Sequence, residues 1–500
     1  MCKNVQYTFL ENIANDGDAS VFKGFDNINN ENIIIKSFKT ESKNIIPKSV
    51  LREVSILRKV ACKYIARLID VFYDDENINI VLEDCGNTIL AYTMEKEFCL
   101  TDRNRITTEL IEAINYLHSI GYIHGDINLK NILFDTVTKL IDFSGSLKVH
   151  RNTFIYKPAI YVCPYELLTT STNNCNMKPL DIWMLGCACY FLVTGNPLFS
   201  SFDEPSHIEM IKDLERCGSF DMIEGVNTPI KKMVKLSPNK RCNILYIVKK
   251  YKSFYEQFNI VPSNICFYEL DRHIINVVHM EYPMNVRWDI MRVLNDDNNN
   301  SIEALFTTFK NLFRMSDTFD IKNIAICFWL SNKFIKGNEV TIEHLDKYTS
   351  KLAETYNTNV KCGINDVYRT LDNLEWDADP YTLYDYIQYI PKIVRAEFIL
   401  LAILLMVEPR FDTASDLLKI YVINEIFNAT LNIPLNRLNT IIAKALSEGY
   451  LDTALTSKFY VDALYYFHNC KNEDRLLSFF DENILLWLYN IDFDKLGKII

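Results

Sequence analysis

The fold of this chain is decided by the stretch YIHGDINLKNIL, residues 122–133. Asp126 stands two residues after His124, and Asn131 follows five residues after Asp126. A second acid, Asp142, comes soon after in the apolar segment 140–143. Two acids and an amide on short loops are the groups that phosphoryl transfer needs: one acid orients a hydroxyl, while the other acid and the amide hold Mg²⁺. Asp126, Asn131 and Asp142 are therefore candidate catalytic and metal-binding residues.

The overall composition limits the classes of protein that this chain can belong to. Its 500 residues suffice for roughly two or three domains, and a content of 49% apolar and 13% aromatic residues predicts globular folding. The net charge of −11 argues against nucleic acid as the main partner. The apolar run from Phe398 to Val407 is about half of what a membrane span needs, so no membrane insertion is expected.

The 14 cysteines stand singly, without a C-x-x-C pair. We expect reduced thiols and no structural zinc, and hence an intracellular protein of the cytoplasm or nucleus. Asn, Ile, Lys, Tyr and Phe are used heavily, as in AT-rich genomes such as those of some viruses and parasites. If the source is viral, the host cell is the expected location.

The first 84 residues predict short strands and one helix. The helix begins at Pro47 and places Val50, Leu51, Val54 and Leu57 on one face. The predicted strands are β-branched or aromatic runs at residues 7–10, 21–25, 33–38, 68–73 and 78–82.

Residues 122–143 resemble the catalytic and metal loops of the eukaryotic protein kinases. The resemblance implies an α+β, bilobal fold that uses ATP and Mg²⁺. Asp126 would be the catalytic acid, and Asn131 and Asp142 would be the metal ligands. Lys36, at the end of an apolar strand, would hold the ATP phosphates through an ion pair with Glu53 of the predicted helix.

The same resemblance assigns residues around the adenine. Ile13 and Val21 would pack on it, Leu82 would be the gatekeeper, and the backbone at Glu83 and Cys85 would bond it. The glycine-rich phosphate loop is poorly preserved, because its three glycine positions read Ala14, Asp16 and Ala19, with Gly17 out of register. Without the resemblance, this segment reads as an ordinary hairpin turn.

Two later motifs support the kinase resemblance. Residues 181–187 match the kinase Asp-x-Trp-x-x-Gly helix, whose Asp181 would brace the catalytic loop. Arg241, in the segment 237–241, would pair with Glu166 at the end of an activation segment that starts at Asp142.

Several positions depart from the family pattern. Asn128 stands where serine/threonine kinases have a lysine, so Lys130 is expected to supply that charge. Gly125 replaces the arginine that grips a phosphorylated loop, which predicts little need for activation-loop phosphorylation. Ser144 replaces the glycine after Asp-Phe, and residues 164–166 read Pro-Tyr-Glu in place of Ala-Pro-Glu.

Residues 47–53 are similar to Pro-Ser-Thr-Ala-Ile-Arg-Glu, the signature helix of the cyclin-dependent kinases, with matches at Pro47, Arg52 and Glu53. From residue 257 onward the pattern is helical, and it predicts an all-α interaction domain. This region resembles a cyclin at residues 291–294, 332–334 and 350–354. An unrelated helical tail and an α-solenoid are the alternatives.

The resemblance to cyclin-dependent kinases and cyclins predicts how the chain is organised. Residues 1–256 would form the kinase domain, with an N-lobe to about 84 and a C-lobe from about 88. A linker at 257–265 would lead to a cyclin-like domain at 266–500. This domain would dock on the helix from Pro47 to Arg58, in the same chain or in a neighbour, with contacts by Arg52, Lys351 and Glu354.

The expected activity is phosphate transfer from ATP to protein hydroxyls, those of Ser or Thr, activated in cis by the cyclin-like domain. The alternative is a pseudokinase–cyclin scaffold that only binds partners. The degenerate glycine loop favours the scaffold. The joint retention of five catalytic positions favours the enzyme: Lys36, Glu53, Asp126, Asn131 and Asp142.

Overall fold

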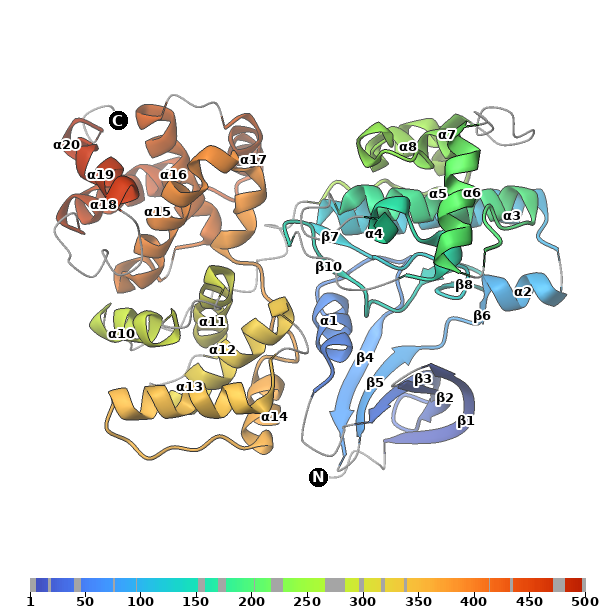
Figure 1. The fold of residues 1–500 in the computed structure, drawn as a ribbon, viewed down its shortest axis with the longest axis horizontal. Coiled ribbons are helices and arrows are strands. Elements are labelled where there is room, and N and C mark those ends of the chain that lie inside the picture. Colours follow the sequence, from blue (N-terminus) through green and yellow to red (C-terminus); the bar gives the residue numbers. More distant parts are fainter. Residues whose placement is uncertain are drawn as a thin grey trace. The chain divides into compact units, whose positions relative to one another are not determined.

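We analysed a computed structural model of the chain (Figure 1). It describes residues 6–16, 19–39, 46–74, 77–95, 97–151, 158–169, 177–201, 203–216, 228–265, 284–295, 301–315, 320–336, 340–412, 414–431, 435–470 and 482–496. The chain divides into two compact units, Met1–Leu270 and Asp271–Ile500.

The first unit begins with a five-stranded antiparallel sheet in the order β1-β2-β3-β5-β4 (Figure 1). Each of the five predicted strands is present. Their bounds are Tyr7–Asp16 for β1, Ala19–Asp26 for β2, Glu31–Lys39 for β3, Leu68–Tyr73 for β4 and Asn77–Glu83 for β5. One face of the sheet forms a small apolar core, which contains Tyr7, Ile33, Ile35, Phe72 and Val81.

Helix α1, Lys48–Leu57, is the predicted helix after Pro47. Its apolar positions Val50, Leu51 and Val54 are fully buried, as the 3.6-residue spacing requires. Glu53 lies on the same buried side and is also 0% exposed. A carboxylate in such apolar surroundings needs a charged partner, so α1 must pack against an element that supplies a basic side chain.

The rest of the first unit is mainly helical, so that a sheet-rich lobe is followed by a helical lobe (Figure 1). Its helices are α2 Ile89–Glu95, α3 Leu100–Ser119, α4 Tyr165–Thr169, α5 Lys178–Thr194, α6 Glu204–Arg216, α7 Thr228–Met233, α8 Ile244–Lys250 and α9 Lys252–Gln257. Short 3-10 turns lie at Ile160–Val162 and Pro238–Lys240.

Five short strands of the helical lobe frame the predicted catalytic stretch. They are β6 Asn87–Thr88, β7 Tyr122–Ile123, β8 Ile132–Phe134, β9 Thr138–Leu140 and β10 Leu147–Lys148. β7 pairs with β10, and β8 lies between β6 and β9. Residues 124–131 thus span from one small sheet to the other, and both ends of this loop are fixed by backbone pairing.

The stretch expected to be a linker is packed on the first unit as far as Ser263. The buried carboxylate of Glu112, on α3, accepts hydrogen bonds from the Tyr255 hydroxyl at 3.0 Å and from the Ser263 amide at 2.7 Å. The Asn115 amide donates to the Ser263 carbonyl at 3.0 Å, and Ile260 is buried. Residues 258–263 therefore behave as part of the helical lobe, because a buried acid and an apolar side chain hold them there.

The described residues of the second unit form helices and no strand. The α-helices are α10 Met284–Asn295, α11 Ile302–Met315, α12 Ile321–Lys336, α13 Ile342–Thr355, α14 Ile364–Asn373, α15 Arg395–Val407, α16 Asp416–Thr430, α17 Asn436–Ser447, α18 Thr453–Cys470, α19 Glu482–Asn490 and α20 Phe493–Leu496. Thr382 and Asp385 form a capping box, which begins a 3-10 helix at Leu383–Tyr389. Two further 3-10 turns lie at Lys392–Val394 and Pro409–Phe411.

The core of the second unit is built around two apolar helices. α12 packs against α11, α13 and α14, and α15 packs against α16. Over the ranges that the structure describes, no helix is both long enough and apolar enough to cross a bilayer. The apolar run of α15 is buried in the core of the unit: Phe398 and residues 400–407 are all buried.

Ion pairs join the first helices of this unit, α10 and α11, to the segment at residues 412–416. Arg287 of α10 binds both carboxylate oxygens of Asp412, at 2.6 and 2.5 Å, and both side chains are almost completely buried. Lys310 of α11 reaches Asp416 of α16 at 2.7 Å. A buried charge is tolerated only with such a partner, so these pairs fix how α10 and α11 meet the segment from Asp412 to Asp416.

We therefore expect Arg287→Ala to lower the free energy of unfolding of the helical unit by about 3–5 kcal/mol, because Asp412 would remain buried without its partner. Urea unfolding followed by tryptophan fluorescence measures this loss, since Trp288, Trp329 and Trp376 all belong to this unit.

The matched control is Arg292→Ala on the same helix. Arg292 and Asp289 form an exposed pair at 3.5 Å, so this variant should change the free energy of unfolding by no more than about 1 kcal/mol. Equal small losses in both variants would contradict a structural role for the buried pair.

Candidate functional site

The ammonium group of Lys36 contacts two acidic side chains from separate elements. Lys36 Nζ of β3 lies 2.8 Å from Glu53 Oε2 of α1 and 3.0 Å from Asp142 Oδ1 of the loop after β9. Burial alone would lower the pKa of Lys36, but the two carboxylates hold it above its ordinary value. Burial would raise the pKa of Asp142, yet the Lys36 charge and the Ser144 N–H bring it down to about 2. Burial raises the pKa of Glu53, although the Lys36 charge acts against this shift. The Lys36 ammonium therefore lies between an ionised Asp142 and the buried side chain of Glu53.

The backbone around Asp142 accommodates the altered triplet Asp142-Phe143-Ser144. Asp142 itself has a left-handed φ of 63°, while Ser144 is not among the residues with positive φ. Serine at position 144 is therefore unstrained, and its N–H donates to Asp142 Oδ1 at 3.3 Å. Phe143 is fully buried, with its ring centroid 4.9 Å from that of His124.

Asp126 is held in place by neighbouring amides. Asn131 Nδ2 donates to Asp126 Oδ2 and to the Asp126 carbonyl, both at 3.0 Å. The Ala159 N–H, on the segment before α4, donates to Asp126 Oδ1 at 3.4 Å. Burial raises the pKa of Tyr161 to about 12, and the charge of nearby Asp126 adds to the effect. The Asp126 carboxylate is thus oriented from both sides while 6% of the residue remains exposed.

Asn128 and Lys130 have different environments. Asn128 is buried, and its side chain accepts from the Lys130 N–H at 2.9 Å and donates to the Asp126 carbonyl at 3.3 Å. It therefore braces the backbone of the loop. The Lys130 side chain is exposed to solvent and can reach an incoming anion.

Two oxygen atoms of the site fit a divalent cation. Among the described residues, Asp142 Oδ2 and Asn131 Oδ1 accept no hydrogen bond, although the other polar atom of each side chain is engaged. Carboxylate and amide oxygens are the ligands that Mg²⁺ prefers. Asn131 and Asp142 therefore fit the expected metal ligands.

Asp181, near the start of α5, ties the loop to the helical core. Its carboxylate accepts from the backbone N–H groups of His124 and Gly125, both at 2.9 Å, and lies 2.9 Å from His118 Nε2. Asp181 is fully buried. Gly125 has a φ of 84°, a left-handed conformation that glycine adopts without strain. Glycine at this position thus suits the backbone that Asp181 holds.

Glu166 and Arg241 form a second buried tie. Arg241 donates to both carboxylate oxygens of Glu166, at 2.6 and 2.8 Å, and its guanidinium lies 4.8 Å from the centroid of the Trp183 ring. It also donates to the carbonyls of Lys235 and Pro179. This one side chain joins α4, α5 and the segment before α8.

The pairing register places the expected adenine-packing residues on one face of the sheet. Val21 of β2 lies opposite Lys36 of β3, and Leu82 of β5 lies opposite Ile34 of β3, so these four side chains share the face that carries Lys36. Sequence reasoning missed Ile34. The alternation of side chains along β3, counted back from Lys36, was the signal that could have found it.

The other residues expected to contact the adenine lie in different surroundings. Ile13 lies at a register shift of β1 and is 45% exposed. The Glu83 carboxylate binds the Arg67 N–H at 2.8 Å and Lys139 Nζ at 2.5 Å, which fixes the connection after β5. Cys85 is buried in an apolar cluster that sequence reasoning missed, with Ala66, Leu133 and Ile141. Gly17 lies outside the described residues.

The residues expected to make cyclin-type contacts lie in different units. Arg52 is half-buried on α1 of the first unit. Lys351 is half-buried and Glu354 is exposed on α13 of the second unit.

Residues 7–251 match the family model of the protein kinase domain. Among similar proteins, cyclin-dependent kinase 12 of Caenorhabditis elegans is 26% identical over 43% of this chain and 31% of its own length. The CTD kinase subunit alpha of Schizosaccharomyces pombe is 27% identical over 42% of this chain and 36% of its own length. A cell cycle serine/threonine-protein kinase of Saccharomyces cerevisiae is 34% identical over 36% of this chain and 25% of its own length. The chain thus spans about a third of the length of these relatives.

We predict that Asp181→Asn loosens the catalytic loop without unfolding the protein. An amide has one acceptor oxygen where the carboxylate has two, so at least one of the His124 and Gly125 N–H groups loses its buried partner, at about 1–3 kcal/mol. Hydrogen–deuterium exchange of the peptide that contains residues 122–133 should become faster. Asp135→Asn, at an exposed acid near this loop, is the control and should leave the exchange unchanged. Unaltered exchange in Asp181→Asn would contradict the bracing role.

Proposed function

Because residues 7–251 form a protein kinase domain, we propose that this chain is an ATP-dependent protein kinase that phosphorylates serine or threonine hydroxyls of proteins. The observation that carries the proposal is the joining of Lys36, Glu53 and Asp142 at 2.8 and 3.0 Å. A protein that had lost phosphoryl transfer would have no need to keep two carboxylates and one lysine in this arrangement.

Each side chain has a role in this proposal. Lys36, held by Glu53, binds the α- and β-phosphates of ATP, and Asn131 with Asp142 holds Mg²⁺. The Mg²⁺ ion, when bound, neutralises charge on the phosphates. Asp126, oriented by Asn131 and by the Ala159 N–H, accepts the hydrogen bond of the substrate hydroxyl and receives its proton.

The departures from the family pattern are compatible with transfer. The backbone at Ser144 does not require glycine, and Gly125 fits the left-handed φ at its position. Asn128 braces the loop, and the exposed Lys130 supplies positive charge for the γ-phosphate. The adenine would lie against Val21, Ile34 and Leu82, with bonds to the backbone at Glu83 and Cys85.

A pseudokinase–cyclin scaffold is the competing function. The altered glycine loop, with Ala14 and Asp16 at two of the three glycine positions, is the observation that favours it. The scaffold does not need Mg²⁺-dependent nucleotide binding, so this property separates the two functions.

We further propose that the helical unit is a cyclin-like activator of the kinase in the same chain. The proposal rests on the similarity of residues 47–53 to the cyclin-dependent kinase helix and on the helical character of the second unit. Docking on α1 would stabilise the conformation in which Glu53 reaches Lys36. Because the units share a chain, their effective concentration is on the order of millimolar if the connection spans the sites. An intracellular location, in the cytoplasm or nucleus, belongs to the same proposal.

We expect calorimetry on the full chain to detect ATP binding that requires Mg²⁺. Lys36→Met and Asp142→Asn should each weaken the binding roughly ten- to a hundredfold, because each removes a charged contact to the nucleotide or its metal. Lys39→Met, at an exposed lysine of the same strand, should bind as the unaltered protein does. If no Mg²⁺-dependent binding is found, the kinase proposal fails and the scaffold remains.

The activator proposal predicts that a chain ending at Ile265 is less active than the full chain, by roughly 5- to 150-fold if the coupling is typical. The truncation keeps residues 258–263, because they belong to the packed helical lobe. Phosphate transfer to a protein substrate is the measurement.

A charge reversal tests the same proposal in the full chain. Lys351→Glu with Glu354→Lys on α13 should lower the activity. The control reversal, Lys458→Glu with Asp462→Lys at exposed positions of α18, should not. If the truncated chain is folded and as active as the whole, the helical unit is not its activator.

A further inference from the structure

The C-terminal part of the kinase lobe is strongly basic in a chain whose net charge is −11. Between Thr228 and Tyr255 the sequence has no acid at all. Its basic residues are Lys231, Lys232, Lys235, Lys240, Arg241, Lys249, Lys250 and Lys252. Arg241 is engaged by Glu166, so the positive charge that this segment presents comes from lysines.

Two of these lysines converge on one aromatic ring of α8. Lys232 Nζ lies 4.6 Å and Lys250 Nζ 5.7 Å from the centroid of the Tyr246 ring. Both lysines are exposed, and Lys249 precedes Lys250 on α8. The apolar side chain of Leu245, next to Tyr246, is 67% exposed. Cation–π contacts thus hold two positive charges beside an exposed apolar residue.

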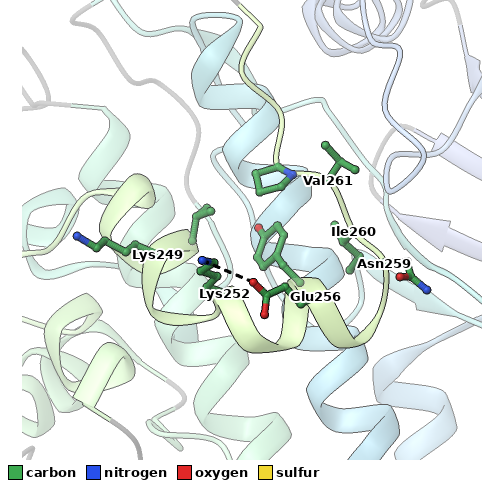
Figure 2. A pocket seen from close by; sticks show the side chains of 9 residues that line it. Lys249, Lys252, Glu256, Asn259, Ile260 and Val261 are labelled. Carbon is green, nitrogen blue, oxygen red and sulfur yellow. Dashed lines mark ion pairs between the residues drawn. The ribbon is translucent and has the colours of Figure 1, made fainter.

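An open pocket of about 660 Å³ adjoins this basic surface (Figure 2). It lies away from the catalytic residues, between the end of α8, α9 and the segment 259–262. Most of its lining is aliphatic or aromatic: Val248, Tyr255, Ile260, Val261 and Pro262. Lys249, Lys252, Glu256 and Asn259 complete it. The volume falls within the range of binding pockets for small ligands and side chains.

The wall of this pocket is fixed before any ligand arrives. Glu112 holds Tyr255 and Ser263, and the Ile260 N–H donates to the Tyr255 carbonyl at 2.8 Å. This support keeps Val261 at the rim with 84% of its surface exposed. A rigid apolar rim beside lysines loses little conformational entropy when a partner covers it.

We infer that this face docks an acidic segment of a protein partner, which places one aliphatic side chain in the pocket and its carboxylates on the surrounding lysines. Lys249 and the two lysines at the Tyr246 ring, Lys232 and Lys250, belong to the segment 228–255, which contains no acid. Lys252 is paired with Glu256 at 3.6 Å, but both side chains are more than 60% exposed, so the pair is weak and can exchange for a carboxylate of the ligand.

The aliphatic lining selects a protein partner over a nucleic acid. A nucleic acid would use the lysines but would gain nothing from a pocket walled by Val248, Ile260 and Val261, because bases bind to flat aromatic platforms. A peptide that combines acids with leucine or isoleucine uses both features. The inference does not depend on catalysis, since the face lies apart from Asp126.

The test uses the full chain and a fluorescein-labelled peptide in which one leucine is flanked on each side by three glutamates. Fluorescence anisotropy should give a Kd of roughly 1–100 µM that weakens as salt is raised. Replacing the glutamates by glutamine, or the leucine by serine, should weaken binding roughly tenfold or more.

Variants of the chain locate the binding site. Lys249→Glu with Lys252→Glu should remove the binding, and Val261→Asp should weaken it roughly tenfold. Lys23→Glu, at an exposed lysine of β2, is the control and should bind as the unaltered chain does. The inference is overturned if no peptide binds, if the glutamine peptide binds equally well, or if Val261→Asp has no effect. A labelled oligothymidine is the alternative ligand. The inference is also overturned if the oligothymidine binds more tightly than the peptide and only the lysine variants remove this binding, because the face would then be a nucleic-acid surface.

Discussion

The ammonium group of Lys36 is the point on which the active arrangement depends. It pairs with the buried side chain of Glu53 and with the half-buried carboxylate of Asp142, which come from elements far apart in the sequence. Without Lys36, α1 would carry an unpaired charge inside an apolar helix face, and the two acids would repel each other. One ion cluster therefore links the position of α1 in the sheet lobe to the position of the loop that carries Asp142 in the helical lobe. Any influence on α1 must act on Asp142 as well.

The catalytic loop is held by polar groups that water does not reach. Asp181 fixes the backbone before Asp126, and Asn131 fixes the Asp126 carboxylate. Asn128, at the position where serine/threonine kinases have a lysine, is hydrogen-bonded to the backbone of the loop. Such a network is preorganised, because its donors already point where they are needed before substrate binds. Buried polar groups with full sets of partners specify one arrangement, whereas one missing partner is expensive. Gly125 and Asn128 thus fit the backbone of this loop, the first by its left-handed φ and the second by its hydrogen bonds.

Sequence reasoning predicted the elements that periodicity and local chemistry determine. The strands are β-branched or aromatic runs with polar breaks, and α1 has a regular apolar face, so both could be placed from the sequence. Ile34 was missed because its role depends on strand pairing. The packing of residues 258–263 was also missed, since Glu112 lies about 150 residues away in the sequence. The Arg287–Asp412 pair has a separation of 125 residues and leaves no local signal either. Contacts across such distances depend on tertiary structure, and no pattern within one element reveals them.

We propose that this site transfers phosphate. The most direct measurement is the transfer of radiolabel from γ-labelled ATP to a mixture of casein and histone by the purified full chain, with Asp126→Asn beside it. We expect label on serine or threonine and a loss of roughly 10²- to 10⁴-fold in the variant, because an amide cannot take the proton of the hydroxyl. Absence of transfer by the unaltered chain, or equal transfer by Asp126→Asn, would contradict it.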